Sequence, residues 1–276
     1  MAKYLRSYVR DGIELPTPTV VHQGEAVLQG PDTVILIASH RRNSILVSLI
    51  NYYTRNLTSL RYVLLVVISD DDDSPIFLLS KAAKKNLVVL RVGNRPVGNK
   101  WQQGVSHARS LGPRSLMICG SDDFITPEYM SRAISMSRDY NFGVVGCNSW
   151  MVVEKLENKQ RLYSVQYTGK SLNQLLGAGR LYSSGFLEIC DWTIFEKRFD
   201  KGLDYKGVQL AQKNKVTIGV CEAAAVVSVK GDWDMINPFS KLASSDFVEV
   251  TELSKKLNCI AGCEDIVSDS NVTLQT

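Results

Sequence analysis

The sequence predicts an α/β protein with a mostly parallel central sheet flanked by helices. Between residues 33 and 150, short β-branched apolar runs alternate with segments whose apolar residues recur at helical spacing. Such alternation implies right-handed strand–helix–strand crossovers, which build a parallel sheet. The chain has 276 residues, enough for one large α/β domain or two small ones with a sizeable core.

Five apolar runs of strand length define the predicted sheet. They cover residues 33–39, 62–69, 87–92, 115–120 and 142–150. The helices between them begin at residues that favour helix starts: Asn43 as an N-cap, Ser74 before a proline, and Thr126 before a proline. A further helix is predicted over 98–112, where a Gly-Pro pair follows.

The segments outside this core are less regular. Residues 1–32 are irregular, with a hairpin predicted around Gln23–Gly24. Beyond residue 150 the pattern predicts a hairpin, two short helices, one or two strands and a last helix. Their ranges are 151–167, 190–198, 204–214, 215–230 and 247–259.

Composition sets broad limits on location and partners. The sequence has no apolar stretch of about 18 residues that would span a membrane and no secretory signal at its start. The six cysteines form no CxxC pair and are typical of small buried side chains in a reducing compartment. We therefore expect a cytoplasmic protein. A net charge of +4 suits phosphate-bearing ligands but is too small to indicate nucleic-acid binding.

Three polar clusters directly follow predicted strands. They are Ser39–Arg42, Asp70–Asp73 and Gly120–Asp123. Ligands of open α/β sheets bind beyond the carboxyl ends of the strands. The three clusters are therefore expected to converge on one edge of one sheet.

Each cluster has a chemical interpretation and a simpler one. Asp122 and Asp123 offer the oxygen ligands that Mg²⁺ and Mn²⁺ prefer, although aspartates also favour plain turns. The run from Asp70 can accept hydrogen bonds from a ribose or pyrimidine, or merely oppose a helix dipole. Arg41 and Arg42 can pair with a diphosphate or belong to a polar loop.

Several common site motifs are absent from the sequence. GxxxxGK[ST], GxGxxG after the first strand, HExxH, GxSxG and the kinase motifs do not occur. The sequence thus argues against a P-loop enzyme and against a dinucleotide-binding Rossmann domain. Lys100, near the start of a predicted helix, remains a candidate anion contact.

The order of these pieces resembles a known family. A strand then "ASHRRNSIL", a strand then "SDDDDS", the helix "GNKWQQGVSHARSLG" and then "SLMICGSDDFITPEYM" resemble the N-terminal half of inverting family 2 glycosyltransferases, which have the GT-A fold. The resemblance covers residues 33 to about 150. The GSDD form with a Lys-Trp-containing helix is similar to a phage- or virus-type branch.

The resemblance implies a division of the chain and a set of donor-site residues. It implies an extension (1–32), a nucleotide-sugar-binding half (33–150), an acceptor-binding and catalytic half (151–246), and a C-terminal helix and tail (247–276). Asp122 is the implied ligand of Mn²⁺ or Mg²⁺. The implied nucleotide-sugar contacts are Ser39, His40, Arg42, Asp70, Asp71, Lys100, Gln102, Ser121, Asp123 and Trp233.

The sequence also departs from the family pattern. Gly120 stands where the first Asp of the D-x-D motif is expected, and no Glu-Asp pair marks the general base. An inverting transfer needs one base to deprotonate the acceptor hydroxyl. Asp191 is the first candidate for that base and Asp204 the second.

The predicted function is metal-dependent transfer of a sugar from a nucleotide-diphosphate sugar, with UDP as the expected nucleotide, to an acceptor hydroxyl with inversion. A glycan or lipid acceptor is the default. A hydroxylated DNA base is the alternative for a viral protein, given the basic residues Lys3, Arg6 and Arg10. A nucleotidyltransferase and a non-catalytic nucleotide-sugar-binding module are the rival classes. The first usually has a glycine-rich loop after its first strand, and "ASHRRNS" has no glycine.

Overall fold

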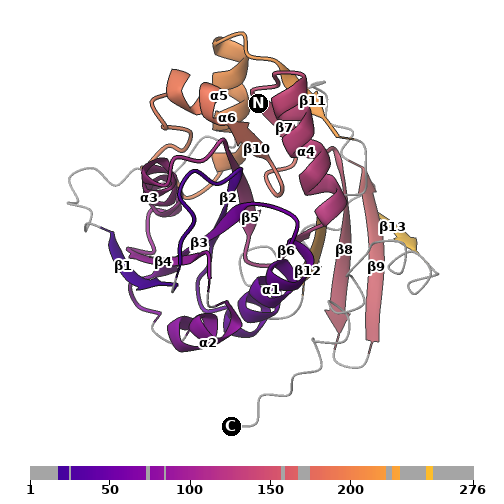
Figure 1. The fold of residues 1–276 in the computed structure, drawn as a ribbon. Coiled ribbons are helices and arrows are strands. Elements are labelled where there is room, and N and C mark those ends of the chain that lie inside the picture. Colours follow the sequence, from indigo (N-terminus) through magenta and orange to yellow (C-terminus); the bar gives the residue numbers. More distant parts are fainter. Residues whose placement is uncertain are drawn as a thin grey trace.

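The computed structural model describes most of the chain in two sheets with helices around them (Figure 1). The described residues are 18–24, 26–72, 75–83, 85–156, 159–166, 175–221, 226–230 and 247–250. Trp233, the N-terminal basic residues and two of the cysteines, Cys259 and Cys263, lie outside these ranges. Among the described residues no helix is long and apolar enough to cross a membrane.

The larger sheet has eight strands in the order β1-β4-β3-β2-β5-β10-β7-β11. Its centre consists of four parallel strands, β2 (Thr33–Ala38), β3 (Tyr62–Ser69), β4 (Leu87–Val92) and β5 (Ser115–Gly120). The prediction of a parallel sheet is confirmed there. The flanking strands are β1 (Thr19–Gln23), β10 (Leu181–Ser183), β7 (Val144–Gly146) and β11 (Ile218–Val220).

Helices cover both faces of this sheet, because side chains along β2 alternate between the two faces and are buried on both. Ile35 and Ile37 pack with α1 (Asn43–Asn56), α2 (Pro75–Ala82) and α4 (Pro127–Asp139). Val34 and Leu36 belong to the core on the other face. There the helices are α3 (Val97–Ser110), α5 (Ser184–Ile189) and α6 (Leu203–Lys213). Figure 1 shows α1 and α2 on the opposite side of the sheet from α3.

A second sheet of five strands has the order β13-β9-β8-β12-β6. Its strands are β6 (Asp123–Ile125), β8 (Ser149–Leu156), β9 (Lys159–Gln166), β12 (Val226–Lys230) and β13 (Phe247–Val250). β6 begins three residues after β5 ends, and β12 pairs with it in antiparallel register, Ser228 opposite Asp123. Strand β6 of the second sheet therefore lies next to the carboxyl end of β5, and its partner β12 also reaches that place.

Four predicted elements differ from the structure. The expected N-terminal hairpin is instead strand β1, which pairs with β4. The predicted strand 142–150 is split, because β7 ends at Gly146 and β8 begins at Ser149 in the other sheet. The helix predicted over 190–198 is displaced to α5, and residues 247–250 form strand β13 rather than the start of a helix. For β1, β8 and β13, pairing with a distant strand overrides a weak local pattern.

Candidate active site

The three strand-end clusters meet at one edge of the larger sheet, as predicted. The Ser69 hydroxyl, at the end of β3, lies 2.8 Å from Nδ1 of His40 and accepts a hydrogen bond from Nζ of Lys100 at 2.8 Å. It donates to Oδ1 of Asn94 at 2.9 Å. The Lys100 ammonium also donates to the Ser39 carbonyl at the end of β2. One serine thus joins the ends of β2, β3 and β4 to the first turns of α3.

The turn after β3 is held by the turn after β2. The Arg41 N–H donates to Oδ2 of Asp72 at 2.6 Å, and its guanidinium pairs with Asp71 at 3.0 Å. Asp72 is buried, whereas Asp70 and Asp71 are exposed. Asp72 therefore anchors the two turns, and Asp70 and Asp71 are the carboxylates of this run that reach solvent.

Asp122 lies between two cations. Its Oδ1 is 3.1 Å from Nη1 of Arg42, which follows β2, and its Oδ2 is 2.6 Å from Nζ of Lys230, the last residue of β12. All three side chains are largely buried, with exposed fractions of 6% for Asp122, 15% for Arg42 and 11% for Lys230. We call these three residues the Asp122 triad.

Asp123 turns back over the end of β5. Its Oδ2 accepts a hydrogen bond from the Gly120 N–H at 3.1 Å, and its Oδ1 accepts one from the Ser228 hydroxyl. Burial and then the adjacent Asp122 carboxylate raise the pKa of Asp123 to about 6. A Cβ at Gly120 would overlap the Asp123 carboxylate. Gly120 therefore stands at this position because Asp123 fills the space that a side chain there would need.

The described residues do not fit the predicted divalent-metal site. Both oxygens of Asp122 are paired with cations, and both oxygens of Asp123 accept hydrogen bonds from Gly120 and Ser228. Within the described ranges no group of three or more His, Cys, Asp or Glu residues is placed to hold a metal ion. A divalent cation needs several oxygen ligands at once, and this arrangement offers a carboxylate that is already neutralised.

Lys100 is a buried cation at this edge of the sheet. Burial lowers the pKa of Lys100 to about 8, against the opposing effect of Asp72, Asp71 and Asp70. Burial also lowers the pKa of His40. The Ser39 hydroxyl is buried with no partner among the described residues. Buried polar atoms are nearly always hydrogen-bonded in proteins, so this orphan marks a place where a ligand atom can bind.

Asp204 lies at the same edge of the fold. It is in the first turn of α6, which follows Gly202 in the left-handed conformation. Its carboxylate packs against Gly177, because a Cβ there would overlap it. The Gly179 N–H, two residues on, donates to the Ile118 carbonyl at 2.8 Å near the end of β5. Asp204 is exposed, so its side chain is accessible from solvent.

A buried arginine fixes the start of α6. The Arg180 guanidinium donates to the Asp204 carbonyl, to the Leu175 carbonyl at 2.5 Å and to the Tyr182 hydroxyl at 3.3 Å. The first turns of α3 and α6 are also in contact, since the Gly98 N–H donates to the Phe199 carbonyl at 2.8 Å. Asp204 is thus held beside the helix that carries Lys100.

Two predicted site residues lie elsewhere. Asp191 is an exposed residue that pairs with Arg109 at 2.9 Å. Arg109 is nine residues beyond Lys100 in α3, about 13 Å along the helix axis, so Asp191 is at the far end of that helix. Gln102 is buried, and its amide bonds the backbone of Trp192, Ile194 and Phe195. Gln102 therefore holds a loop, and the assignment of Asp191 as general base loses its geometrical support.

Ser121 and Lys230 also lie at the end of β5. Ser121 is buried next to the Asp pair, and the contacts among the described residues assign it no role. No sequence motif indicates Lys230, because only the pairing of β12 with β6 and β8 brings it to Asp122. The one signal in the sequence was a lysine that directly ends the apolar strand "VVSV".

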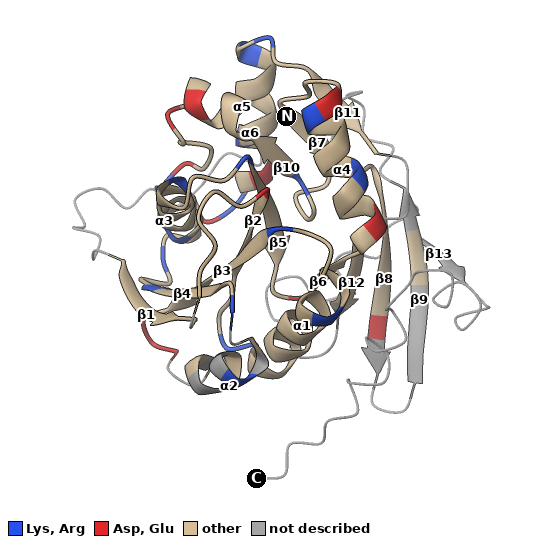
Figure 2. Ribbon diagram, in the orientation of Figure 1, with Lys and Arg blue, Asp and Glu red and all other residues tan. Residues whose placement is uncertain are grey.

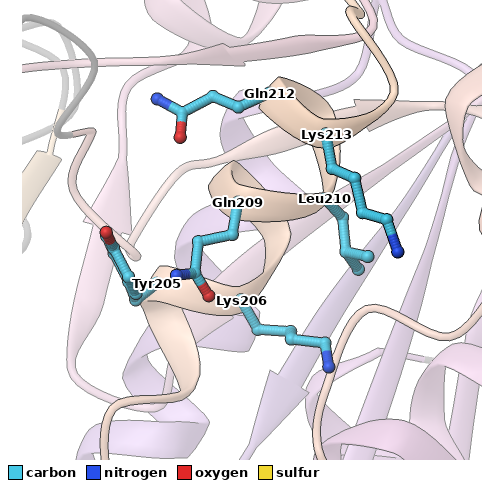
Figure 3. A pocket seen from close by; sticks show the side chains of 6 residues that line it. All are labelled: Tyr205, Lys206, Gln209, Leu210, Gln212 and Lys213. Carbon is cyan, nitrogen blue, oxygen red and sulfur yellow. The ribbon is translucent and has the colours of Figure 1, made fainter.

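A shallow, open hollow of about 490 Å³ lies along α6 (Figure 3). Its lining residues all belong to that helix. They are Tyr205, Lys206, Gln209, Leu210, Gln212 and Lys213. None of them belongs to the strand-end clusters, so this hollow is a surface feature next to Asp204 and separate from those clusters.

Comparison with solved structures identifies the fold as that of GT-A glycosyltransferases. Residues 1–349 of TarS from S. aureus match with a TM-score of 0.52 and 16% identity, over 72% of this chain and 60% of that chain. The same protein with UDP-GlcNAc gives a TM-score of 0.54 and 15% identity, over 72% of this chain and 58% of that one.

A mannosyltransferase, PcManGT from Pyrobaculum calidifontis in complex with GDP-Man and Mn²⁺, has a TM-score of 0.48 and 11% identity, over 76% of this chain and 60% of that chain. The chain thus spans about 60% of the length of the TarS fragment and of PcManGT. No protein-family model and no curated protein matches the sequence.

Proposed function

We propose that this protein is an inverting glycosyltransferase that takes its sugar from a nucleotide-diphosphate sugar. The observation that carries the proposal is the network of polar side chains joining the ends of β2, β3, β5 and β12 within a GT-A fold. In sheets of this type the ligand binds outside the carboxyl ends of the strands. Both anion-binding groups and carboxylates for a ribose or base gather at that edge.

The donor would bind along this edge. Asp70 and Asp71 are the exposed carboxylates that can accept hydrogen bonds from the ribose or base. Lys100 and His40, with the unpartnered Ser39 hydroxyl, lie where the nucleotide would pass from β3 to β2. UDP is the proposed nucleotide, in keeping with the TarS complexes with UDP-GlcNAc and UDP.

Asp204 is the proposed general base. It is exposed, it lies at the start of a helix beside α3, and Arg180 holds its backbone in place. In the transfer, the acceptor oxygen attacks the anomeric carbon and gives its proton to the Asp204 carboxylate. The bond from that carbon to the diphosphate oxygen breaks, and the diphosphate leaves with the electron pair. Attack opposite the leaving group inverts the anomeric centre.

The acceptor hydroxyl is supplied by a glycan, a lipid or a hydroxylated DNA base. Figure 2 shows acidic and basic residues mixed over the described elements, which does not favour a polyanion over the other acceptors. Salt-dependent binding to duplex DNA would distinguish the DNA acceptor.

Donor binding and turnover test this function directly. The purified full chain is titrated calorimetrically with UDP, GDP and their sugar conjugates, and release of the nucleoside diphosphate is then followed with each acceptor class. We expect one UDP-sugar to bind and to be consumed, with inverted product configuration by NMR. Folded protein that binds and hydrolyses no nucleotide sugar would refute the proposal. Release of pyrophosphate from a nucleoside triphosphate and a sugar phosphate would instead indicate a nucleotidyltransferase.

A further inference from the structure

The Asp122 triad is assembled from three parts of the chain. Arg42 comes from the turn after β2, Asp122 from the turn after β5, and Lys230 from the end of β12. Ser228 and Lys230 are two residues apart in a strand and so share one face, and they contact Asp123 and Asp122 respectively. The second sheet thus delivers one hydroxyl and one ammonium to the acidic pair.

The charge of this triad equals that of a metal-bound carboxylate. One carboxylate with an arginine and a lysine has a net charge of plus one, and so does one carboxylate with a single divalent cation. Both cations are largely buried, and electrostatic interactions are stronger there than in bulk water. A guanidinium has five N–H donors and an ammonium has three, so each can bind Asp122 and a phosphate oxygen at once.

We propose that Arg42 and Lys230 replace the divalent cation, so that sugar transfer in this protein needs no metal. They would neutralise the negative charge that builds up on the diphosphate oxygen as its bond to the anomeric carbon breaks. Asp122 holds the two like charges together and orients them. This inference rests on the proposed glycosyltransferase activity and concerns how the same site activates its donor.

The surroundings of Asp122 give independent support. Positions 120 and 123 are the neighbours of Asp122 in the chain that could offer a second metal-binding carboxylate. A side chain at Gly120 would collide with Asp123, and the Asp123 carboxylate is held by the Gly120 N–H and the Ser228 hydroxyl. Among the described residues the chain thus supplies cations to Asp122 where a metal site would need further oxygen ligands.

Metal removal tests the inference without any mutation. The full chain and its donor are treated with a chelating resin, and turnover is measured in excess EDTA and again with added Mn²⁺ or Mg²⁺. We expect rates within about twofold in all three conditions. In parallel, the electron paramagnetic resonance signal of free Mn²⁺ is titrated with protein plus UDP and with UDP alone. We expect the protein to add no Mn²⁺ binding beyond that of the nucleotide.

Variants of Lys230 connect the effect to the triad. Lys230→Met removes the charge at similar length and is expected to lower donor turnover about 100- to 1,000-fold, the usual effect of losing one transition-state donor. Lys230→Arg is expected to retain most of the rate. Lys85→Met is the matched control, because Lys85 is exposed and precedes β4 at the opposite edge of the sheet. Thermal unfolding confirms that each variant is folded.

The outcomes separate the two proposals. Donor turnover that falls more than tenfold in EDTA and returns with Mn²⁺ overturns the metal-free inference and leaves the glycosyltransferase proposal standing. A protein–UDP complex that binds Mn²⁺ tightly and stoichiometrically would overturn it as well. Failure to bind or turn over any donor, with and without metal, would refute the glycosyltransferase proposal itself and the inference with it.

Discussion

Replacing Asp122 with asparagine distinguishes the Asp122 triad from a metal site that is empty. The substitution should lower the free energy of unfolding if Asp122 is paired with two cations, and should leave it unchanged or raise it if Asp122 is part of an empty metal site. Asparagine keeps the shape of the side chain and removes its charge. At the observed distances of 3.1 and 2.6 Å, each charge pair attracts by about 5 to 6 kcal/mol at an effective dielectric constant of 20. Desolvation offsets most of this attraction. Breaking such a buried pair by removing one partner typically costs about 3–5 kcal/mol, because the remaining charges stay buried.

We therefore expect Asp122→Asn to lower the free energy of unfolding by about 3–5 kcal/mol. That corresponds to a fall in the melting temperature of roughly 6–20 °C in a chain of this size. Urea unfolding in EDTA, followed by circular dichroism, measures the change. In a metal site without its metal, two adjacent carboxylates repel, and the same substitution would be neutral or stabilising. A variant as stable as the wild type, or more so, would refute the triad.

Three further predictions concern neighbouring residues. Asp204→Asn is expected to lower kcat about 100- to 10,000-fold with little change in the KM for the donor. Asp191→Asn loses only an exposed ion pair, so its kcat should stay close to that of the wild type. Equal effects of the two substitutions on kcat would refute the assignment of Asp204 as the base. Because burial lowers the pKa of Lys100 to about 8, the lysine loses its charge above that pH, and the donor affinity measured calorimetrically should fall. Lys100→Met should remove this pH dependence of the affinity. A wild-type affinity that does not change with pH would contradict the prediction. Gly120→Asp restores the family motif but places a side chain where the Asp123 carboxylate lies, so it should destabilise the protein in thermal unfolding and should not create Mn²⁺ binding.

The parallel half of the fold could be predicted because its signal is local and periodic. The strand predicted over 62–69 coincides with β3, and those predicted over 87–92 and 115–120 coincide with β4 and β5. Each is a continuous apolar run because both of its faces are covered by helices. The convergence of the three polar clusters follows from the same rule, since parallel strands end at one edge.

The second half could not be predicted as well, because its order depends on long-range pairing. β10 lies between β5 and β7 as a three-residue antiparallel strand, and no periodicity is visible in so short a segment. The choice between Asp191 and Asp204 depended on where α5 ends and α6 begins. Asp191 follows α5 at a residue with positive φ and faces solvent, whereas Asp204 is in the first turn of α6.

The absent first aspartate of the motif and the unexpected lysine are parts of one arrangement. With glycine at position 120, Asp123 can fold back onto the end of β5, and that position is stabilised by Ser228 from β12. The strand that carries Ser228 places Lys230 two residues further along the same face, where it pairs with Asp122. The glycine at position 120 and the lysine at position 230 therefore both depend on the register between β12 and β6. A shift of one residue would turn Ser228 and Lys230 together away from Asp123 and Asp122. The second sheet thus sets the charge at the end of β5, and with it the chemistry that this edge of the fold can support.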